Sequence, residues 1–190
     1  MEILRDPLGN DDPPRGSVLS IGNFDGIHLG HQAVLRHVVE RARTLSAPAL
    51  AMTFDPHPIK LLRPADAPRL LTTLEQRLDL IARTGIETCL LVPFTHRVAR
   101  MTAENFVRDV LVDRLAIREV YIGKNFRVGA DRGGDVDLLT QLGQELGFEA
   151  ASSPIVEHAG GVVSSTRVRQ TVSEGRVDEA AELLDRAVFI

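Results

Sequence analysis

The stretch Ile21-Gly22-Asn23-Phe24-Asp25-Gly26-Ile27-His28-Leu29-Gly30-His31 decides how this chain of 190 residues is expected to fold. The apolar residues 17–21 lead into it. Apolar residues at helical spacing follow it: Val34, Leu35, Val38, Val39 and Ala42. This order predicts a strand, a tight glycine turn and a helix. Free N–H groups at a helix N-terminus attract phosphate, and glycines 22 and 26 have no Cβ to keep a bulky anion away. The stretch therefore predicts a nucleotide site.

The two histidines of this stretch stand three residues apart, so His28 and His31 share one face of the first helical turn. A single histidine is more often a surface or core residue, but this pair has a glycine between its members and a glycine turn before it. Nucleotidyl transfer suits such a pair, because attack on an α-phosphate builds negative charge that fixed donors stabilise. A metal site is the alternative, but two histidines without a nearby third ligand are weak evidence for one.

A second polar stretch, residues 163–169, places hydroxyl side chains before two arginines. Ser164, Ser165 and Thr166 stand where a helix is expected to begin, and Arg167 and Arg169 follow them. Unpaired N–H groups, hydroxyl donors and guanidinium groups together form a phosphate cradle. The plainer interpretation is an ordinary helix cap with two solvated arginines.

Strands and helices are expected to alternate along the rest of the chain. The further expected strands are 49–54, 88–92, 119–122 and 149–153. The further expected helices are 74–83, 103–114 (capped by Thr102), 136–146, 165–173 and 178–184 (capped by Asp178). This alternation predicts an open, mostly parallel α/β sheet with ligands at the carboxyl ends of its strands. We expect one domain after a flexible lead-in, residues 1–16.

Three loops are expected to flank the site. Two prolines in the stretch 55–58 are expected to exclude a helix and to hold the chain extended. Residues 61–71 contain two more prolines and are interpreted as a surface loop, with a lid as one possibility. Residues 123–134 contain four glycines and four charged side chains, which is typical of a functional loop.

Composition excludes several classes of protein. A hydrophobic content of 44% indicates an ordinary folded domain, and a net charge of −4 gives no general attraction to nucleic acid or to anionic membranes. No apolar run approaches the roughly 20 residues that span a bilayer. Cys89 is a single cysteine in an apolar run, so we expect a buried thiol with neither a disulfide nor a cysteine-based zinc site. A cytoplasmic location is expected, because residues 1–16 contain no hydrophobic signal core.

Four motifs carry a resemblance to a known family. The stretch 28–31 resembles the HxGH signature of the nucleotidyltransferase superfamily, whose members have a Rossmann-like sheet with helices on both faces. Residues 163–169 resemble its SSTxxR signature, with Arg169 at the final arginine and Arg167 at a position that the signature leaves open. Residues 53–58 and 123–129 resemble the FDPHP-type and GxNFRFG loops of FMN adenylyltransferases. From about residue 17 to residue 187, the chain is similar to the FMN adenylyltransferase module of bacterial bifunctional riboflavin kinase/FAD synthetases.

This resemblance implies that ATP and FMN are converted to FAD and pyrophosphate with Mg²⁺. The FMN phosphate would attack the ATP α-phosphate directly and in line, without a covalent enzyme intermediate. The implied catalytic residues are His28, His31 and Arg169. The implied ATP-binding residues are Gly22, Asn23, Phe24, Asp25, Gly26, Gly30, Ser164, Ser165, Thr166 and Arg167. The implied flavin-binding residues are Phe54, Pro56, His57, Pro58, Phe106, Asn125 and Arg127. The Mg²⁺ would be held mainly by phosphates and waters, so no protein ligand is assigned.

Two departures from the family pattern bear on this expectation. Val128 replaces a common phenylalanine, and with 4% aromatic residues Phe54 and Phe106 remain the expected stacking partners of the flavin. No residues remain for a riboflavin kinase domain, so kinase activity is not expected and a separate kinase would supply FMN. The alternatives are a nucleotidyltransferase with another phosphorylated acceptor, such as phosphopantetheine, nicotinamide mononucleotide or a polyol phosphate, or a non-catalytic flavin or adenine-nucleotide binding protein.

Overall fold

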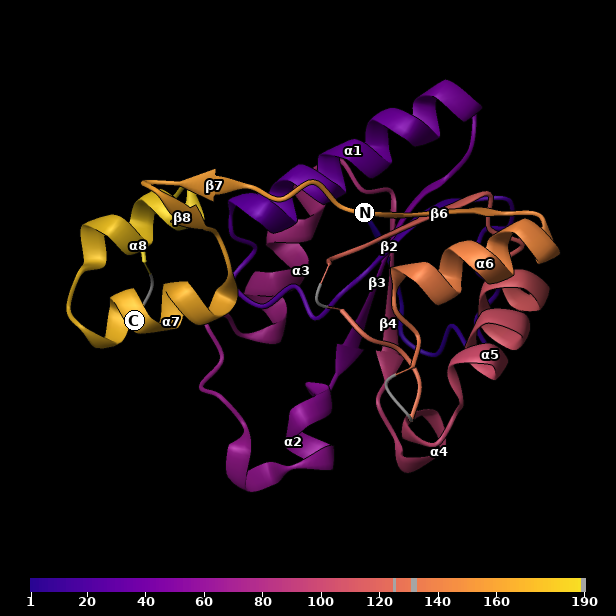
Figure 1. The fold of residues 1–190 in the computed structure, drawn as a ribbon, viewed down its shortest axis with the longest axis horizontal. Helices are drawn as coiled ribbons and strands as arrows, with labels where there is room; N and C mark the ends of the chain where they lie inside the picture. Colours follow the sequence, from indigo (N-terminus) through magenta and orange to yellow (C-terminus); the bar gives the residue numbers. More distant parts are fainter. Residues whose placement is uncertain (125, 131–132, 189–190) are drawn as a thin grey trace.

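The computed structural model describes residues 1–124, 126–130 and 133–188. These residues form a six-stranded sheet in the order β1-β4-β3-β2-β5-β6, in which every neighbouring pair is parallel (Figure 1). The strands are Glu2–Leu4 (β1), Val18–Ile21 (β2), Ala49–Asp55 (β3), Thr88–Pro93 (β4), Glu119–Ile122 (β5) and Glu149–Ser152 (β6). The predicted parallel α/β sheet is confirmed.

The strand order fixes where a ligand can lie. From β2 the chain builds outward through β3 to β4, and then it returns to place β5 on the other side of β2. The direction of building therefore reverses between β2 and β5. In open α/β sheets the binding crevice lies outside the carboxyl ends of the strands at such a point. The glycine turn that follows β2 and the loop that follows β5 both begin at this crevice.

Helices cover both faces of the sheet, as expected. The helical segments are α1 (Leu29–Leu45), α2 (Pro58–Leu62), the 3-10 turn η1 (Pro64–Asp66), α3 (Leu74–Ala82), α4 (His96–Ala99), α5 (Ala103–Asn105), the π-helix η2 (Phe106–Arg114), α6 (Val136–Leu146), α7 (Ser165–Ser173) and α8 (Val177–Leu184). Two short strands, β7 (Glu157–His158) and β8 (Gly161–Val162), form an antiparallel hairpin before α7. Within the described ranges, every helix is too short or too polar to cross a membrane.

Alternation along the strands divides the core into two layers. Val18 of β2 and the small residues Ala49 and Ala51 of β3 pack with α1 and α3 in one cluster. Leu19 of β2 and Met52 of β3 face the other way, into a cluster with η2 and α6. Successive strand residues point to opposite faces, so one strand supplies both layers. Cys89 belongs to the first layer and is fully buried, as predicted, and burial raises the pKa of its thiol to about 12.

Several sequence-based expectations need correction. A short helix, α2, stands where two prolines were expected to exclude one. Pro58 occupies its first position, where the missing N–H is not needed, and His57 Nδ1 accepts the Ile59 N–H at 3.3 Å. The expected loop 61–71 therefore begins inside α2 and contains η1.

The expected helix 103–114 forms, but it has two geometries. It starts as α5, with Thr102 as the predicted cap, and continues as the π-helix η2. The wider turn is visible where the Leu115 N–H donates to Val110 O at 3.0 Å, five residues back. The predicted cap Asp178 is wrong, because α8 begins at Val177 and its N-cap is Arg176.

Three strands were not predicted from the sequence. Glu2–Leu4, placed in the lead-in, forms β1 and pairs with β4 at the edge of the sheet. The lead-in is also bonded to η2, because Arg114 donates to Pro7 O and Gly9 O at 3.1 Å each. The hairpin β7–β8 was missed because two-residue strands leave no periodic pattern to detect.

Candidate active site

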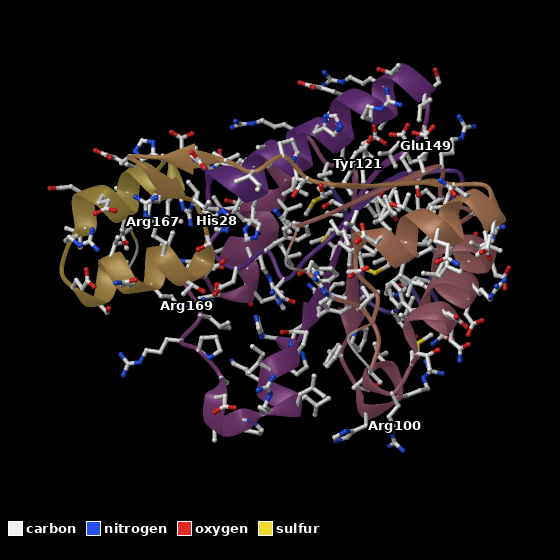
Figure 2. All side chains as sticks on the ribbon, viewed as in Figure 1. His28, Arg100, Tyr121, Glu149, Arg167 and Arg169 are labelled. Carbon is white, nitrogen blue, oxygen red and sulfur yellow. The ribbon has the colours of Figure 1, made fainter. Side chains whose placement is uncertain are left out.

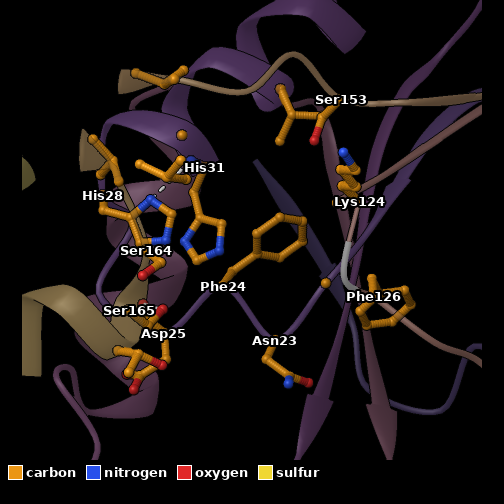
Figure 3. A pocket seen from close by; sticks show the side chains of 18 of the residues that line it. Asn23, Phe24, Asp25, His28, His31, Lys124, Phe126, Ser153, Ser164 and Ser165 are labelled. Carbon is orange, nitrogen blue, oxygen red and sulfur yellow. Dashed lines mark hydrogen bonds between the residues drawn. The ribbon is translucent and has the colours of Figure 1, made fainter. Parts of the chain in front are cut away.

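A cavity of about 880 Å³ opens at the reversal point of the sheet, beside β2 and β5 (Figure 3). Its wall comes from the turn after β2, the start of α1, the α2–η1 segment, the loops after β5 and β6, and the start of α7. Twelve of the predicted site residues line it: Gly22, Asn23, Phe24, Asp25, His28, Gly30, His31, His57, Ser164, Ser165, Thr166 and Arg169. The structure thus brings together the two polar stretches, which lie more than 130 residues apart in the chain.

The two histidines of the HxGH stretch stack on each other at the N-terminal end of helix α1. Their ring centroids lie 3.7 Å apart with 18° between the ring planes. His28 is the N-cap of α1, and its Nδ1 accepts the backbone N–H of His31 at 3.3 Å. Since Nδ1 accepts, the proton of a neutral His28 ring is on Nε2, which leaves Nε2–H as the donor. The His31 Nδ1 is buried and has no partner among the described residues.

Burial makes both imidazoles neutral at neutral pH. Burial lowers the pKa of His28 to about 4, and the opposing effect of the Asp25 carboxylate does not outweigh it. Burial also lowers the pKa of His31 well below its usual value, and the neighbouring His28 lowers it further. Two neutral imidazoles that face a cavity can donate hydrogen bonds to an anion. A bound anion would in turn raise their pKa values.

The glycines of the turn make room for these rings. A Cβ on Gly22 would lie 3.0 Å from the Phe24 ring, and a Cβ on Gly30 would lie 3.2 Å from the His28 ring. Phe24 meets His31 edge-on at 5.3 Å. Gly26, predicted to approach the nucleotide, does not line the cavity. Its φ of +86° and its N–H bond to Thr72 Oγ1 at 3.2 Å give it a role in shaping the turn.

Asp25 is the central acceptor of the site. Its carboxylate is 3% exposed and pairs with Arg169 Nη2 at 2.5 Å. It also accepts the N–H of Leu71 at 2.9 Å and the N–H of Thr72 at 3.2 Å. Its backbone carbonyl accepts Ser165 Oγ–H at 2.9 Å. Asp25, a single residue in the turn after β2, therefore holds both the segment before α3 and the start of α7 in place.

The two arginines of the second motif face different surroundings. Arg169 lies at the cavity with Asp25, whereas Arg167 turns back toward α8, as Figure 2 shows. Arg167 pairs with Glu179 at 3.0 Å and donates to the carbonyls of His158 and Gly161 at 2.8 Å each. Arg167 thus holds the β7–β8 hairpin, and the structure does not bring it to the ATP-binding set predicted for it.

Most of the predicted flavin-binding residues are not at the cavity. Phe54 and Phe106 are 5% and 4% exposed and belong to the main core cluster, because both point to the face covered by η2 and α6. Pro56, Pro58 and Arg127 do not line the cavity either. Asn125 lies outside the described residues. Among the six that the structure describes, His57 alone lines the cavity.

Other residues supply the apolar wall instead. The wall also contains residues that were not predicted from the sequence: Ser20, Ile21, Val34, Ile59, Asp66, Pro68, Gly123, Lys124, Phe126, Ser153, Pro154, Ile155, Val156, Val162 and Val163. Phe126 stands in the GxNFRFG-like loop, so its position was a usable signal. Ile155 and Val162 are more than half exposed, which is uncommon for aliphatic side chains of this size. Their exposure depends on the tertiary structure, so no signal for them is present in the sequence.

The fold and this cavity define the class of the protein: an α/β domain of the nucleotidyltransferase type, with a paired-histidine site at the switch point of its sheet. The FAD synthetase family model matches residues 10–167, and the chain belongs to that family.

Similarity to named relatives supports this assignment. The chain is 40% identical over 172 residues to the bifunctional riboflavin kinase/FMN adenylyltransferase of Escherichia coli K12, covering 90% of this chain and 55% of that protein. It is 38% identical to the Pseudomonas fluorescens protein of the same name, covering 98% of this chain and 60% of that one. A putative protein of that name from Geobacillus thermodenitrificans is 39% identical, with 89% of each chain covered.

A solved structure shows the same fold. The crystal structure of a macrolide-efflux protein from Streptococcus pneumoniae superposes with a TM-score of 0.81 at 28% identity, covering 98% of this chain and 60% of that one. The present chain thus spans little more than half the length of the E. coli relative and of this structural neighbour.

Proposed function

We propose that this chain transfers the adenylyl group of ATP to FMN, which yields FAD and pyrophosphate. The observation that carries the proposal is the stacked, neutral histidine pair at the reversal point of the sheet, opposite the hydroxyl side chains that start α7. Membership of the FAD synthetase family and relatives named FMN adenylyltransferase support the choice of acceptor. The cavity of about 880 Å³ is at the upper end of the usual range of about 300–1,000 Å³, which suits two substrates at once.

The sheet order suggests how the substrates divide the cavity. The turn with the histidines follows the central strand β2, and the α2–η1 segment follows β3 on one side. The apolar segment with Ile155 and Val156 follows β6 on the other side. We place the triphosphate at the two histidines and at residues 164–166. The adenosine then lies toward β6, and the flavin lies toward α2, where His57 and Ile59 line the wall.

The chemistry needs positioning and charge stabilisation. A phosphate monoester of FMN is already ionised near pH 7, so its oxygen attacks the ATP α-phosphorus without a general base. The new bond is the one between this oxygen and the α-phosphorus, and the bond to the bridging oxygen of pyrophosphate breaks in line. His28 Nε2–H and the hydroxyl groups at the start of α7 stabilise charge on the transferring phosphate and on the leaving group. Arg169 lines the cavity while it pairs with Asp25, so its guanidinium group also faces the bound phosphates.

Mg²⁺ is proposed to enter with the nucleotide. Within the described part of the chain, no three metal-ligating side chains gather into a cluster, and Asp25 is already occupied by Arg169 and two backbone N–H groups. Mg²⁺ commonly keeps several waters and is bound by substrate phosphates together with one or two carboxylates. The ion supplies further charge neutralisation on the phosphates.

The test is a direct assay of the product. The purified chain is incubated with ATP, Mg²⁺ and FMN, and in parallel with riboflavin, and the flavins are separated by chromatography. FAD should form from FMN and not from riboflavin, because riboflavin lacks the phosphate that attacks. Absence of FAD, with tight binding of flavin or ATP retained, would contradict the proposal and favour a binding protein or another acceptor.

The role of the histidine pair is tested by His31→Ala. We expect a loss of turnover of about a hundredfold or more, with FMN affinity changed much less, because the imidazole acts on the transferring phosphate. His37→Ala is the matched control on the same helix, since its ring packs edge-on against Tyr121 at 4.7 Å and does not line the cavity. Equal losses of turnover and FMN affinity in His31→Ala would contradict the assigned role.

A further inference from the structure

The turn that leads into His28 is hydrogen-bonded to the segment that follows α8 and to a side chain of α1. Figure 1 shows α7 and α8 beside the N-terminal end of α1. Arg186, two residues after α8, donates from Nη2 to Gly26 O at 2.7 Å and from Nη1 to Ile27 O at 3.5 Å. Gln32 of α1 donates from Nε2 to the same Ile27 carbonyl at 3.2 Å. The two peptide carbonyls immediately before His28 therefore both accept side-chain donors.

The same two side chains also meet on the far side of the turn. Gln32 Nε2 donates to Leu184 O at 3.0 Å, and Arg186 Nη1 donates to this carbonyl at 3.2 Å. Arg36 Nη2 donates to Gln32 Oε1 at 3.1 Å, which directs the amide nitrogen of Gln32 toward the carbonyls. Leu184 is 3% exposed, so the end of α8 is itself anchored in the core. We call these hydrogen bonds of Arg186 and Gln32 to residues 26, 27 and 184 the brace, and its far end lies at the buried end of α8.

The turn needs such a brace because its backbone is strained. Ile27 has a φ of +40°, in the left-handed region that β-branched residues avoid. Such a conformation is unfavourable and persists only where the surroundings enforce it. His28, the next residue, has an extended backbone with a φ of −68° and a ψ of 171°, and its imidazole projects from this backbone toward His31. A relaxed Ile27 would rotate the next peptide and move the ring away from His31.

Arg186 is costly to keep in this place. Burial lowers the pKa of its guanidinium, and its Nε is buried without a partner among the described residues. A half-buried arginine that pairs with carbonyls rather than with a carboxylate contributes geometry more than net stability, because its desolvation is only partly offset. Its planar fork can hold two neighbouring carbonyls at once, which a lysine ammonium on its flexible stem does poorly.

We propose that Arg186 and Gln32 are positioning residues that hold the strained turn 26–28, and through it the His28 imidazole, in the orientation used for phosphate transfer. This inference rests on the proposed function for its kinetic consequence. It assigns to the segment after α8 a part in the activity of a site formed about 160 residues earlier in the chain.

Kinetics form the first test, run below the melting temperatures of all the variants. Arg186→Gln should lower kcat at least tenfold and change the KM for ATP less than threefold, because a misplaced ring of even 1 Å costs up to about a hundredfold in rate. Gln32→Met should act in the same direction, and Arg186→Lys should recover part of the loss. The matched control is Arg176→Gln, which removes a half-exposed arginine at the start of α8 that pairs with Glu174 and should leave kcat unchanged. An unchanged kcat in Arg186→Gln, or an equal fall in Arg176→Gln, would overturn the inference.

A second measurement does not depend on the activity. In the ligand-free protein, NMR signals of the His28 ring and of the His31 amide, which donates to His28 Nδ1, should shift in Arg186→Gln and not in Arg176→Gln. If the wild-type chain makes no FAD, the proposed function fails while these shifts still report on the brace. If the signals stay in place while kcat falls, Arg186 does not act through His28 and the inference is wrong.

Discussion

Acidification is expected to destabilise this fold through His28. The side chain is 6% exposed, and burial lowers its pKa from 6.5 to about 4. At a pH between these two pKa values, His28 is protonated in the unfolded chain and neutral in the folded protein. Stability is therefore fully present above pH 6.5 and is lost as the pH falls toward 4. At about 1.4 kcal/mol for each factor of ten in proton affinity, the full loss is about 3 kcal/mol.

The assay compares the wild-type chain with His28→Gln. Urea unfolding at pH 7.5 and at pH 4.5 gives the free energy of unfolding of each protein. The wild-type protein should lose about 2.5 kcal/mol more than His28→Gln between these two pH values. His31 titrates in the same direction, and it contributes to both proteins. His96→Gln, which removes an exposed histidine from α4, is the matched control and should keep the wild-type difference.

The reasoning would be refuted by equal losses of stability in the wild-type protein and in His28→Gln. That result would mean that His28 is accessible to water and protonates in the folded state with its ordinary pKa. The imidazole would then carry a charge at mildly acidic pH. The neutral donor assigned to it would have to be abandoned.

Three further outcomes follow from the packing. Asp25→Asn should lower the free energy of unfolding by about 3 kcal/mol in urea titrations, because Arg169 loses the carboxylate that compensates its charge. Arg169→Gln should raise the Kd for ATP, measured by calorimetry, about tenfold or more, whereas Arg167→Gln should change it less than threefold, since that side chain faces the hairpin. Gly143→Ala should cost about 2 kcal/mol of stability in thermal melts and leave kcat/KM unchanged, because its Cβ would lie 2.4 Å from Phe148 O, far from the site.

Local patterns predicted the elements well where the chain is regular. The helices Val136–Leu146 and Ser165–Ser173 have the predicted bounds, since apolar periodicity and cap residues act within a few neighbours. The same local reasoning failed at Pro58, where a proline opens a helix. It also failed for the π-helix η2, whose wider turn has no signature in the pattern of side chains.

The candidate site was predicted in part. The histidine pair and the hydroxyl residues of α7 could be recognised from spacing, because their chemistry is legible in a few adjacent residues. Phe54 and Phe106 were placed in the flavin site because aromatic side chains suit a flat ring. Both are instead core residues, since the register of β3 and the packing of η2 turn them away from the cavity.

The sequence by itself determined the alternation of the main strands and helices, the glycine turn and the chemistry of the histidine pair. Only the tertiary structure decided which residues meet. Asp25 finds Arg169 across 144 residues, and Arg186 finds Gly26 across 160. Arg167 and Arg169, two positions apart, point about 200° apart around α7 because a helix has 3.6 residues per turn. Which of them faces the cavity depends on the side of α7 that packs against α8, where Val168 is fully buried. Long-range packing makes that choice, and no local pattern encodes it.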